Sequence, residues 1–303
     1  MILNNRGNIE ICEKYKLNMP MYSVLYRNKL YVLLRHPFAE NDKSGLVSFD
    51  IGKNMNLVRK SKTVSTMGEV ACHLCGAKGK MYAVNYISGS IISMPDKIVI
   101  HKGKSVNPKR QEKAHAHFIT PTPDGKYLLV TDLGMDKIIT YTKELEPVCV
   151  TDSAAGSGPR HLVFSDNGQF VFCANELSST ISAYKYFNGT LTLYDEKSTL
   201  PNNCKIDNAP AAIRYSNDRI YVSNRGDDSI AVFDFNGEFL SQKAVFPCGG
   251  KSPRDFVVID SFIVSANELS DSITVMDING NIISSYTDVK RPNCITYMCN
   301  SII

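Results

Sequence analysis

The sequence has no tryptophan, no long apolar run and no leader-like beginning, and each absence removes a class of protein. The lack of tryptophan among 303 residues argues against WD-type repeats. No apolar run is long enough to cross a bilayer, and residues 1–11 lack the charged and then apolar layout of a signal peptide. We therefore expect a cytoplasmic protein that has no membrane partner.

Several enzyme signatures are also missing. The chain contains no GxSxG sequence, no P-loop and no dinucleotide fingerprint, which disfavours the usual serine hydrolases and nucleotide enzymes. Nine cysteines are scattered singly through strand-like segments, so we expect free, buried thiols rather than disulfides. The pair Cys72 and Cys75 has no second pair to complete a zinc site. No metal and no other cofactor is predicted.

The composition is that of an ordinary globular chain. Hydrophobic residues make up 43% and charged residues 21%, which is enough for a large core. The net charge of +4 does not suggest nucleic acid as a partner, although it would suit a small anionic substrate. We expect a monomer or a small homo-oligomer.

The most informative feature is an internal repeat. A polar residue follows an apolar, β-rich segment at intervals of 43 to 49 residues, and a small polar turn and another strand-like segment come after it. Hairpin turns such as Asp124-Gly125 and Asn167-Gly168 lie between the strand-like segments. The recurring polar residues, called the polar column below, are Asn85, Asp132, Asn175, Asn224 and Asn267.

Units of this length with four short strands each are typical of β-propeller blades. We predict an all-β fold, a single seven-bladed propeller domain over residues 1–303 with four-stranded antiparallel blades. Residues 291–298 look like the first strand of a blade, and residues 3–11 match the middle of one. The N-terminal and C-terminal segments are therefore expected to close the last blade together, which would remove exposed sheet edges. The basic insertion at residues 101–113 is predicted to be a solvated surface loop.

Two positions in each repeat hold the candidate site residues. The position that opens the first strand holds Cys72, His117, Arg160, Ala211, Arg254 and Asn293. The position directly after the polar column holds Tyr86, Leu133, Glu176, Arg225 and Glu268. The ionisable residues are concentrated in the third to sixth blades, whereas a purely structural ring would hold similar residues throughout. This asymmetry favours a site at the mouth of the central channel.

Such a set of His, Arg and Glu residues can act on a carbonyl compound. A His or Glu can take a proton from water, and Arg can bind anionic oxygens or stabilise a developing oxyanion. For any single residue the alternative is a structural ion pair, for example between Arg160 and Glu176, that holds neighbouring loops together.

Four stretches of the sequence resemble the propeller lactonase family, whose type member is the bacterial 6-phosphogluconolactonase. They are KAHAHFITPTPDGKYLLVTDLGMDKIITY, GPRHLVFSDNGQFVFCANELSSTISAY, SNRGDDSIAVF and KSPRDFVVIDSFIVSANELSDSITVM. Residues 107–111 also resemble the Asn-Pro-x-Arg-Gln loop of that family. The resemblance implies a seven-bladed propeller that contains no metal. It also implies that the protein hydrolyses 6-phosphoglucono-δ-lactone to 6-phosphogluconate in the oxidative pentose phosphate pathway.

The resemblance also implies which residues act. The family's HxH, GPRH, NE and SNRG motifs correspond here to His117 (or His115), Arg160, Glu176 and Arg225. We expect His117 or Glu176 to be the base, one Arg to stabilise the oxyanion and another to bind the phosphate of a small anionic sugar-lactone. Further substrate contacts are expected from His115, Arg254, Glu268, Arg110 and Tyr86, with Lys113 beside Arg110.

Two alternatives stay open on the sequence. One is a different reaction at the same arginines, namely a carboxy-muconate-type lactonising cycloisomerase or the hydrolysis of another sugar lactone. The other is a non-catalytic propeller that serves as an interaction scaffold, in which case His117, Arg160, Glu176 and Arg225 would not meet in one pocket.

Overall fold

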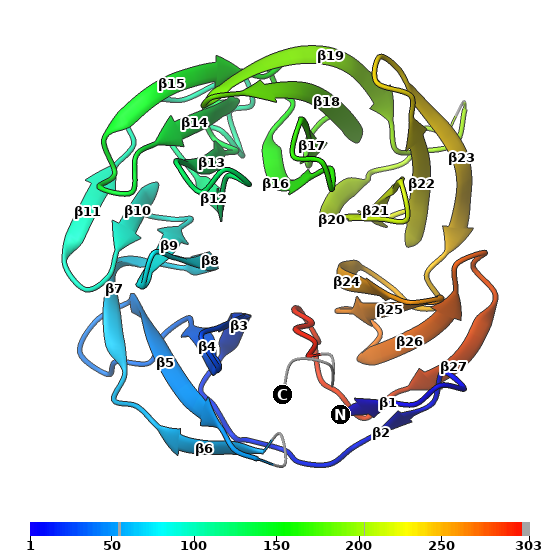
Figure 1. The fold of residues 1–303 in the computed structure, drawn as a ribbon, viewed down its shortest axis with the longest axis horizontal. Helices are drawn as coiled ribbons and strands as arrows, with labels where there is room; N and C mark the ends of the chain where they lie inside the picture. Colours follow the sequence, from blue (N-terminus) through cyan, green and yellow to red (C-terminus); the bar gives the residue numbers. More distant parts are fainter. Residues whose placement is uncertain (54–55, 203, 299–303) are drawn as a thin grey trace. The chain divides into compact units, whose positions relative to one another are not determined.

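The structure, a computed structural model, describes residues 1–53, 56–202 and 204–298, shown in Figure 1. Its regular elements are all β-strands, and no helix among these residues is long and apolar enough to cross a membrane. Contacts divide the chain into two compact units, one of residues 1–14 with 160–295 and the other of residues 15–159 with the residues from Thr296. A single domain over residues 1–303 remains a prediction.

The unit of residues 15–159 contains three antiparallel sheets in which consecutive strands are neighbours, as Figure 1 shows. The first sheet consists of β3 (Pro20–Tyr26), β4 (Lys29–Leu34), β5 (Lys43–Ile51) and β6 (Leu57–Lys60), with β7 (Val64–Glu69) also paired to β5. The second consists of β8 (Ala71–Ala77), β9 (Lys80–Asn85), β10 (Ser90–Ser93) and β11 (Lys97–Ile100). The third consists of β12 (Ala116–Pro121), β13 (Leu128–Asp132), β14 (Lys137–Tyr141) and β15 (Pro147–Asp152).

The other unit contains three further four-stranded sheets and one short hairpin. Its first sheet consists of β16 (Pro159–Phe164), β17 (Phe170–Asn175), β18 (Thr180–Phe187) and β19 (Thr190–Ser198). The next consists of β20 (Ala209–Ser216), β21 (Arg219–Arg225), β22 (Ser229–Phe235) and β23 (Leu240–Pro247). The last consists of β24 (Pro253–Ile259), β25 (Phe262–Asn267), β26 (Ser272–Asp277) and β27 (Ile282–Tyr286). The hairpin pairs β1 (Ile2–Leu3) with β2 (Ile9–Glu10).

These antiparallel four-stranded sheets are propeller blades, and they confirm the predicted repeat. The sequence segments predicted as second and third strands are strands of these sheets. They are β9 and β10, β13 and β14, β17 and β18, β21 and β22, and β25 and β26. The predicted hairpin turns are also present, because Gly125 and Gly168 adopt a positive φ and their N–H groups close turns onto residues 122 and 165. The blades therefore follow from short apolar strands alternating with turn residues.

The polar column lies at the end of the second strands and is fully buried in every blade where it was predicted. In four blades the Asn Nδ2 donates a hydrogen bond to the hydroxyl five residues later, at distances of 2.9 to 3.3 Å. The pairs are Asn85–Ser90, Asn175–Thr180, Asn224–Ser229 and Asn267–Ser272. The side chain thus ties the end of the second strand to the start of the third.

The space around the column is tight. A Cβ added to Gly68 would lie 2.5 Å from Nδ2 of Asn85, and one added to Gly250 would lie 2.4 Å from Nδ2 of Asn267. Only glycine leaves room for the amide at these points.

The two candidate positions are held next to each other by the same architecture. The residue after the column donates its backbone N–H to the residue near the start of the first strand, as in Tyr86 to Val70 (2.9 Å) and Glu268 to Ser252 (2.9 Å). The first strands then shift register at the predicted opening position, for example at His117 and Arg254. Such a bulge re-aims the side chain of the extra residue.

The core lies between neighbouring sheets of each unit. One cluster joins Phe172 and Ala183 to Ile213 and Phe233 of the next sheet, and all four are almost completely buried. Another joins Val84 and Ile91 to Ile119 in the other unit. Sheet-on-sheet burial of this kind keeps adjacent blades together by the hydrophobic effect.

The predicted seventh blade differs from the structure. Residues 291–298 form no strand, so their prediction as a first strand is wrong. The backbone N–H of Ile295 donates to the Asp255 carboxylate (2.8 Å) rather than to a strand partner. The N-terminal hairpin has only two residues in each strand, but Leu3, Ile9 and Ile295 pack on the same cluster of the last sheet. The terminal segments are therefore neighbours without forming a regular four-stranded blade.

We expect Asn267→Ala to destabilise the protein by about 1–3 kcal/mol, because it leaves the buried hydroxyls of Ser265, Ser272 and Thr274 without their amide partner. Urea unfolding measures the change. Asn279→Ala, in an exposed turn, is the matched control and should change the free energy of unfolding by less than about 0.5 kcal/mol. Equal effects of the two substitutions would contradict a structural role for the column.

Candidate functional site

Three predicted residues form one cluster in the unit of residues 160–295. The Nε of Arg160 donates to Oε2 of Glu176 (2.8 Å), and Nη2 of Arg225 lies 2.8 Å from the same oxygen. Arg160 and Glu176 are buried, and the Arg225 side chain is only 16% exposed. The cluster carries a net positive charge, since two guanidinium groups share one carboxylate.

The two arginines are also fixed by backbone carbonyls of β20. Nη1 of Arg160 donates to the carbonyl of Ala211 (2.6 Å), and Nε of Arg225 donates to the carbonyl of Ala209 (3.1 Å). The guanidinium groups are therefore oriented before any substrate arrives, as electrostatic catalysis requires.

One donor of this cluster remains unsatisfied. Nη2 of Arg225 is buried, and among the described residues no acceptor is aligned with its N–H groups, although Glu176 attracts it as an ion partner. Buried donors are nearly always hydrogen-bonded, so an orphaned one calls for an explanation. A substrate oxygen at this nitrogen would supply the missing acceptor.

A second cluster repeats the pattern in the last sheet. Nη1 of Arg254 donates to Oε2 of Glu268 (3.1 Å), and Nη2 of Arg291 donates to Oε1 of the same carboxylate (2.7 Å). Burial alone would raise the pKa of Glu268, but the charges and hydrogen bonds of Arg254 and Arg291 outweigh it and lower the pKa below its ordinary value of 4.5.

The other unit holds the predicted aromatic and imidazole residues. The rings of Tyr86 and His115 are stacked with centroids 4.4 Å apart, and His117 meets Tyr86 edge-on at 5.6 Å. Nη2 of Arg110 donates to the Tyr86 hydroxyl across 3.4 Å, and Nε2 of His115 is 3.2 Å from Glu112. His115, Tyr86, His117 and Arg110 therefore form one group within this unit.

A buried polar chain supports that group. Oδ1 of Asp132 accepts the backbone N–H of His115 (2.8 Å), and its Oδ2 lies 2.6 Å from Nδ1 of His101. Nε2 of His101 is in turn 2.8 Å from the Tyr141 hydroxyl. Burial first, and then the charge of Asp132, raise the pKa of Tyr141 to about 12. Asp132 replaces the usual Asn of the polar column, and it fixes the backbone of His115.

The sequence predicts a solvated surface loop at residues 101–113, but part of this loop is buried. His101 and Gln111 are buried, and Nε2 of Gln111 donates to the carbonyl of Leu133 (2.9 Å). These two side chains find polar partners inside the unit, which the basic composition of the loop conceals.

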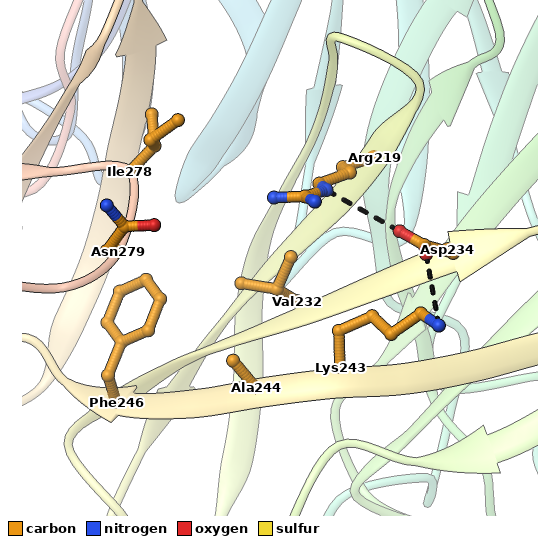
Figure 2. A pocket seen from close by; sticks show the side chains of 8 residues that line it. All are labelled: Arg219, Val232, Asp234, Lys243, Ala244, Phe246, Ile278 and Asn279. Carbon is orange, nitrogen blue, oxygen red and sulfur yellow. Dashed lines mark ion pairs between the residues drawn. The ribbon is translucent and has the colours of Figure 1, made fainter.

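A pocket of about 400 Å³ lies elsewhere, as Figure 2 shows. Its charged residues are Arg219, Asp234 and Lys243, and Arg219 points across it toward Asn279. Asp234 already pairs with both cations, at 3.6 and 3.3 Å, and all three side chains are more than 40% exposed. Arg219 begins β21 whereas Arg225 ends it, so the pocket is at the opposite end of the strand from the buried cluster. We place the candidate site at the buried cluster, because its charges are fixed and shielded from water.

No three His, Cys, Asp or Glu side chains are gathered for a metal within the part of the chain that the structure describes. Burial raises the pKa of the Cys75 thiol to about 12, which keeps it protonated and unreactive. All cysteines among the described residues are free thiols, and Cys75, Cys173 and Cys248 are the buried ones among them.

Sequence reasoning missed one member of the charged clusters. Arg291 belongs to neither candidate position, because it precedes Pro292 where the chain turns with a positive φ of 46°. Ser252 before Pro253 has the same backbone conformation, with φ of 59°. The Arg-Pro dipeptide at the expected start of a blade was therefore the available signal.

Comparison with known proteins gives the family. Residues 2–297 match the family described as "Lactonase, 7-bladed beta-propeller". The chain belongs to this lactonase family. A protein of Staphylococcus aureus strain USA300, described as uncharacterized, is 33% identical over 90% of this chain and 85% of its own length.

Solved structures agree on the fold. A protein of Lactobacillus plantarum is 30% identical, with a TM-score of 0.81 over 91% of this chain and 86% of that one. A putative 6-phosphogluconolactonase of Bacteroides fragilis is 24% identical, with a TM-score of 0.80 over the same shares of the two chains. At that identity the second likeness shows the fold alone.

We expect Glu268→Gln to lower the melting temperature near neutral pH, because it removes a carboxylate that Arg254 and Arg291 stabilise. A lowered folded-state pKa stabilises the protein above the unfolded value of about 4.5, and this contribution is lost as the pH falls through the folded value. The difference from the parent protein should therefore shrink below about pH 4.5 in melting curves. Glu238→Gln, at an exposed bend, is the control and should leave the melting temperature near neutral pH unchanged.

Proposed function

We propose that the protein is a lactone hydrolase that converts 6-phosphoglucono-δ-lactone to 6-phosphogluconate. The family supports lactone chemistry, and the buried cluster supports a substrate that develops negative charge on oxygen. The Nη2 of Arg225 carries the proposal, because it is a fixed and buried cationic donor whose N–H groups have no aligned acceptor among the described residues, although Glu176 lies beside it.

The proposed reaction is an attack of water on the lactone carbonyl. A base takes one proton from the water as its oxygen bonds to the carbonyl carbon, and the carbonyl oxygen becomes an oxyanion. Arg225 donates to this oxyanion, a role that requires a donor within about 3 Å. The bond to the ring oxygen then breaks, and the base returns its proton to that oxygen. The carboxylic acid product releases one proton to water.

Two groups are proposed for the base, Glu176 and His117. Glu176 lies beside Arg225, but both arginines bind its Oε2 and compete with a water molecule for that oxygen. His117 is buried at the bulge of β12, edge-on to Tyr86. In this proposal Arg160 orients Glu176, and Tyr86, His115, Arg110, Arg254 and Glu268 contribute substrate contacts.

The seven-blade count belongs to the same proposal. The family description gives seven blades, whereas the described residues form six sheets of four or more strands and one two-stranded hairpin. We propose that the hairpin β1–β2 and the C-terminal segment around Ile295, although not a regular four-stranded sheet, together occupy the place of the seventh blade. Their shared packing on Val257 and Val264 supports this.

The purified protein should hydrolyse 6-phosphoglucono-δ-lactone faster than the spontaneous reaction, as followed by proton release at constant pH. The control is the same assay without protein, because the substrate hydrolyses by itself. A folded protein that gives no rate above this background would refute the proposed substrate. Lys243→Ala, in the pocket of Figure 2, should leave the rate unchanged.

Arg225→Gln should lower kcat by about 10²–10³-fold, because its shorter and neutral side chain removes the charged donor to the oxyanion. Circular dichroism and melting curves check that the variant folds. Glu176→Gln and His117→Gln separate the two candidate bases, since loss of the base should cost about 10²–10⁴-fold and abolish the acid limb of the pH–rate profile. If Arg225→Gln retains full kcat, the oxyanion role is wrong.

A further inference from the structure

The two Arg–Glu–Arg clusters occupy equivalent positions but differ in exposure. Arg254 corresponds to Arg160 and Glu268 to Glu176, since each Arg follows the proline that opens a first strand and each Glu follows the Asn of the polar column. The third Arg comes from different places. Arg225 ends β21, whereas Arg291 lies after β27, outside any strand.

Exposure separates the two clusters. In the first, the side chains of Arg160 and Glu176 are 3% and 6% exposed. In the second, the Arg291 side chain is 70% exposed, although one of its nitrogens is bound to Glu268. The first cluster is a closed charge arrangement, and the second ends in a cation that faces water.

Arg291 is exposed but not loosely placed. Its backbone N–H donates to Oδ1 of Asp271 (2.8 Å), and its Nη2 donates to Oε1 of Glu268 (2.7 Å). Glu268 is itself held by Arg254. An Arg fixed at both ends has already lost much of its conformational freedom, which lowers the entropy cost of binding an anion.

The chemistry of this group suits a charged oxyanion such as phosphate. A guanidinium presents five N–H donors in a rigid fork that matches phosphate or carboxylate. The bond to Glu268 engages one edge of the Arg291 fork, and the high exposure leaves donors toward solvent. Arg254, Arg291 and Glu268 sum to +1, and the Asp271 carboxylate that accepts the Arg291 backbone N–H brings the local sum to zero. The attraction for an anion therefore comes from the exposed guanidinium of Arg291 rather than from net charge.

We propose that Arg291 recognises the phosphate of the substrate and so determines the preference for a phosphorylated over a non-phosphorylated sugar lactone. This inference rests on the proposed lactonase function. Besides the substrate contact proposed above, Glu268 positions Arg291 through the hydrogen bond to its Nη2. The buried Arg225 serves the reacting carbonyl instead, and Arg160 orients Glu176.

The test compares two lactones that differ only in the phosphate, glucono-δ-lactone and its 6-phosphate, by proton release. For Arg291→Ala we expect KM for the phosphorylated lactone to rise about 10–100-fold, the loss of one charge-assisted contact, with kcat unchanged. KM for glucono-δ-lactone should change less than about twofold, and Arg291→Lys should restore part of the preference because it keeps the charge.

Lys290→Ala is the matched control, since it removes a neighbouring exposed cation. It should leave both KM values unchanged. Three outcomes would overturn the inference but leave the lactonase function standing. In Arg291→Ala, KM could rise equally for both lactones or rise for neither. In Lys290→Ala, KM for the phosphorylated lactone could rise as much as in Arg291→Ala. A parent protein that hydrolyses only glucono-δ-lactone would also overturn the inference. A parent protein that hydrolyses neither lactone would refute the proposed function and, with it, the inference.

Discussion

The blades depend on one repeated interaction, the hydrogen bond from a buried Asn side chain at the end of a second strand to a hydroxyl on the third. An amide without water must find partners inside the sheet, which fixes the length and course of the intervening turn. The next residue is thereby held against the start of the first strand, as the backbone bond from Glu268 to Ser252 shows. The constraint that sets the blade therefore also sets the direction in which Tyr86 and Glu268 are presented.

The buried ion pairs at this position are difficult to explain by stability alone. Desolvation of both partners offsets much of the attraction in a buried pair, and apolar residues of similar volume are often as stable. The third sheet shows the apolar solution, because Leu133 occupies the equivalent position and is fully buried. The Arg160–Glu176 pair is the structural contact that the sequence suggested as an alternative, and a catalytic role for it belongs to the proposed function. A charge arrangement kept in place at this cost is suited to stabilising charge that appears during a reaction.

The sequence predicts the local parts of this structure well and the long-range parts poorly. Strands β17 and β18 were predictable because each is a short apolar run, and the polar residue and turn between the two runs mark where one strand ends and the next begins. The loop around His101 was not, because its partners Asp132 and Tyr141 lie 31 and 40 residues away and local composition does not encode such contacts. The sequence did suggest an ion pair between Arg160 and Glu176, but only the structure shows that Arg160 and Arg225 share one oxygen of that carboxylate. The last blade failed because a strand needs a partner, and the segment at Ile295 binds a side chain instead.

The difference in exposure between the two Arg–Glu–Arg clusters matches the two charges of the proposed substrate, the oxyanion that develops during the reaction and the phosphate that is charged beforehand. An oxyanion that forms during the reaction has no hydration shell to lose, so a buried and preoriented guanidinium stabilises it at little cost. A phosphate is charged before it binds, and drawing it into a buried site would forfeit its hydration. An Arg at the surface, held by Glu268 but open to water, can bind such a group while both remain partly solvated. In the proposed reaction, the cluster held by the backbone carbonyls of Ala209 and Ala211 would meet the developing charge, and the exposed Arg291, where the chain leaves the last sheet, would meet the permanent charge.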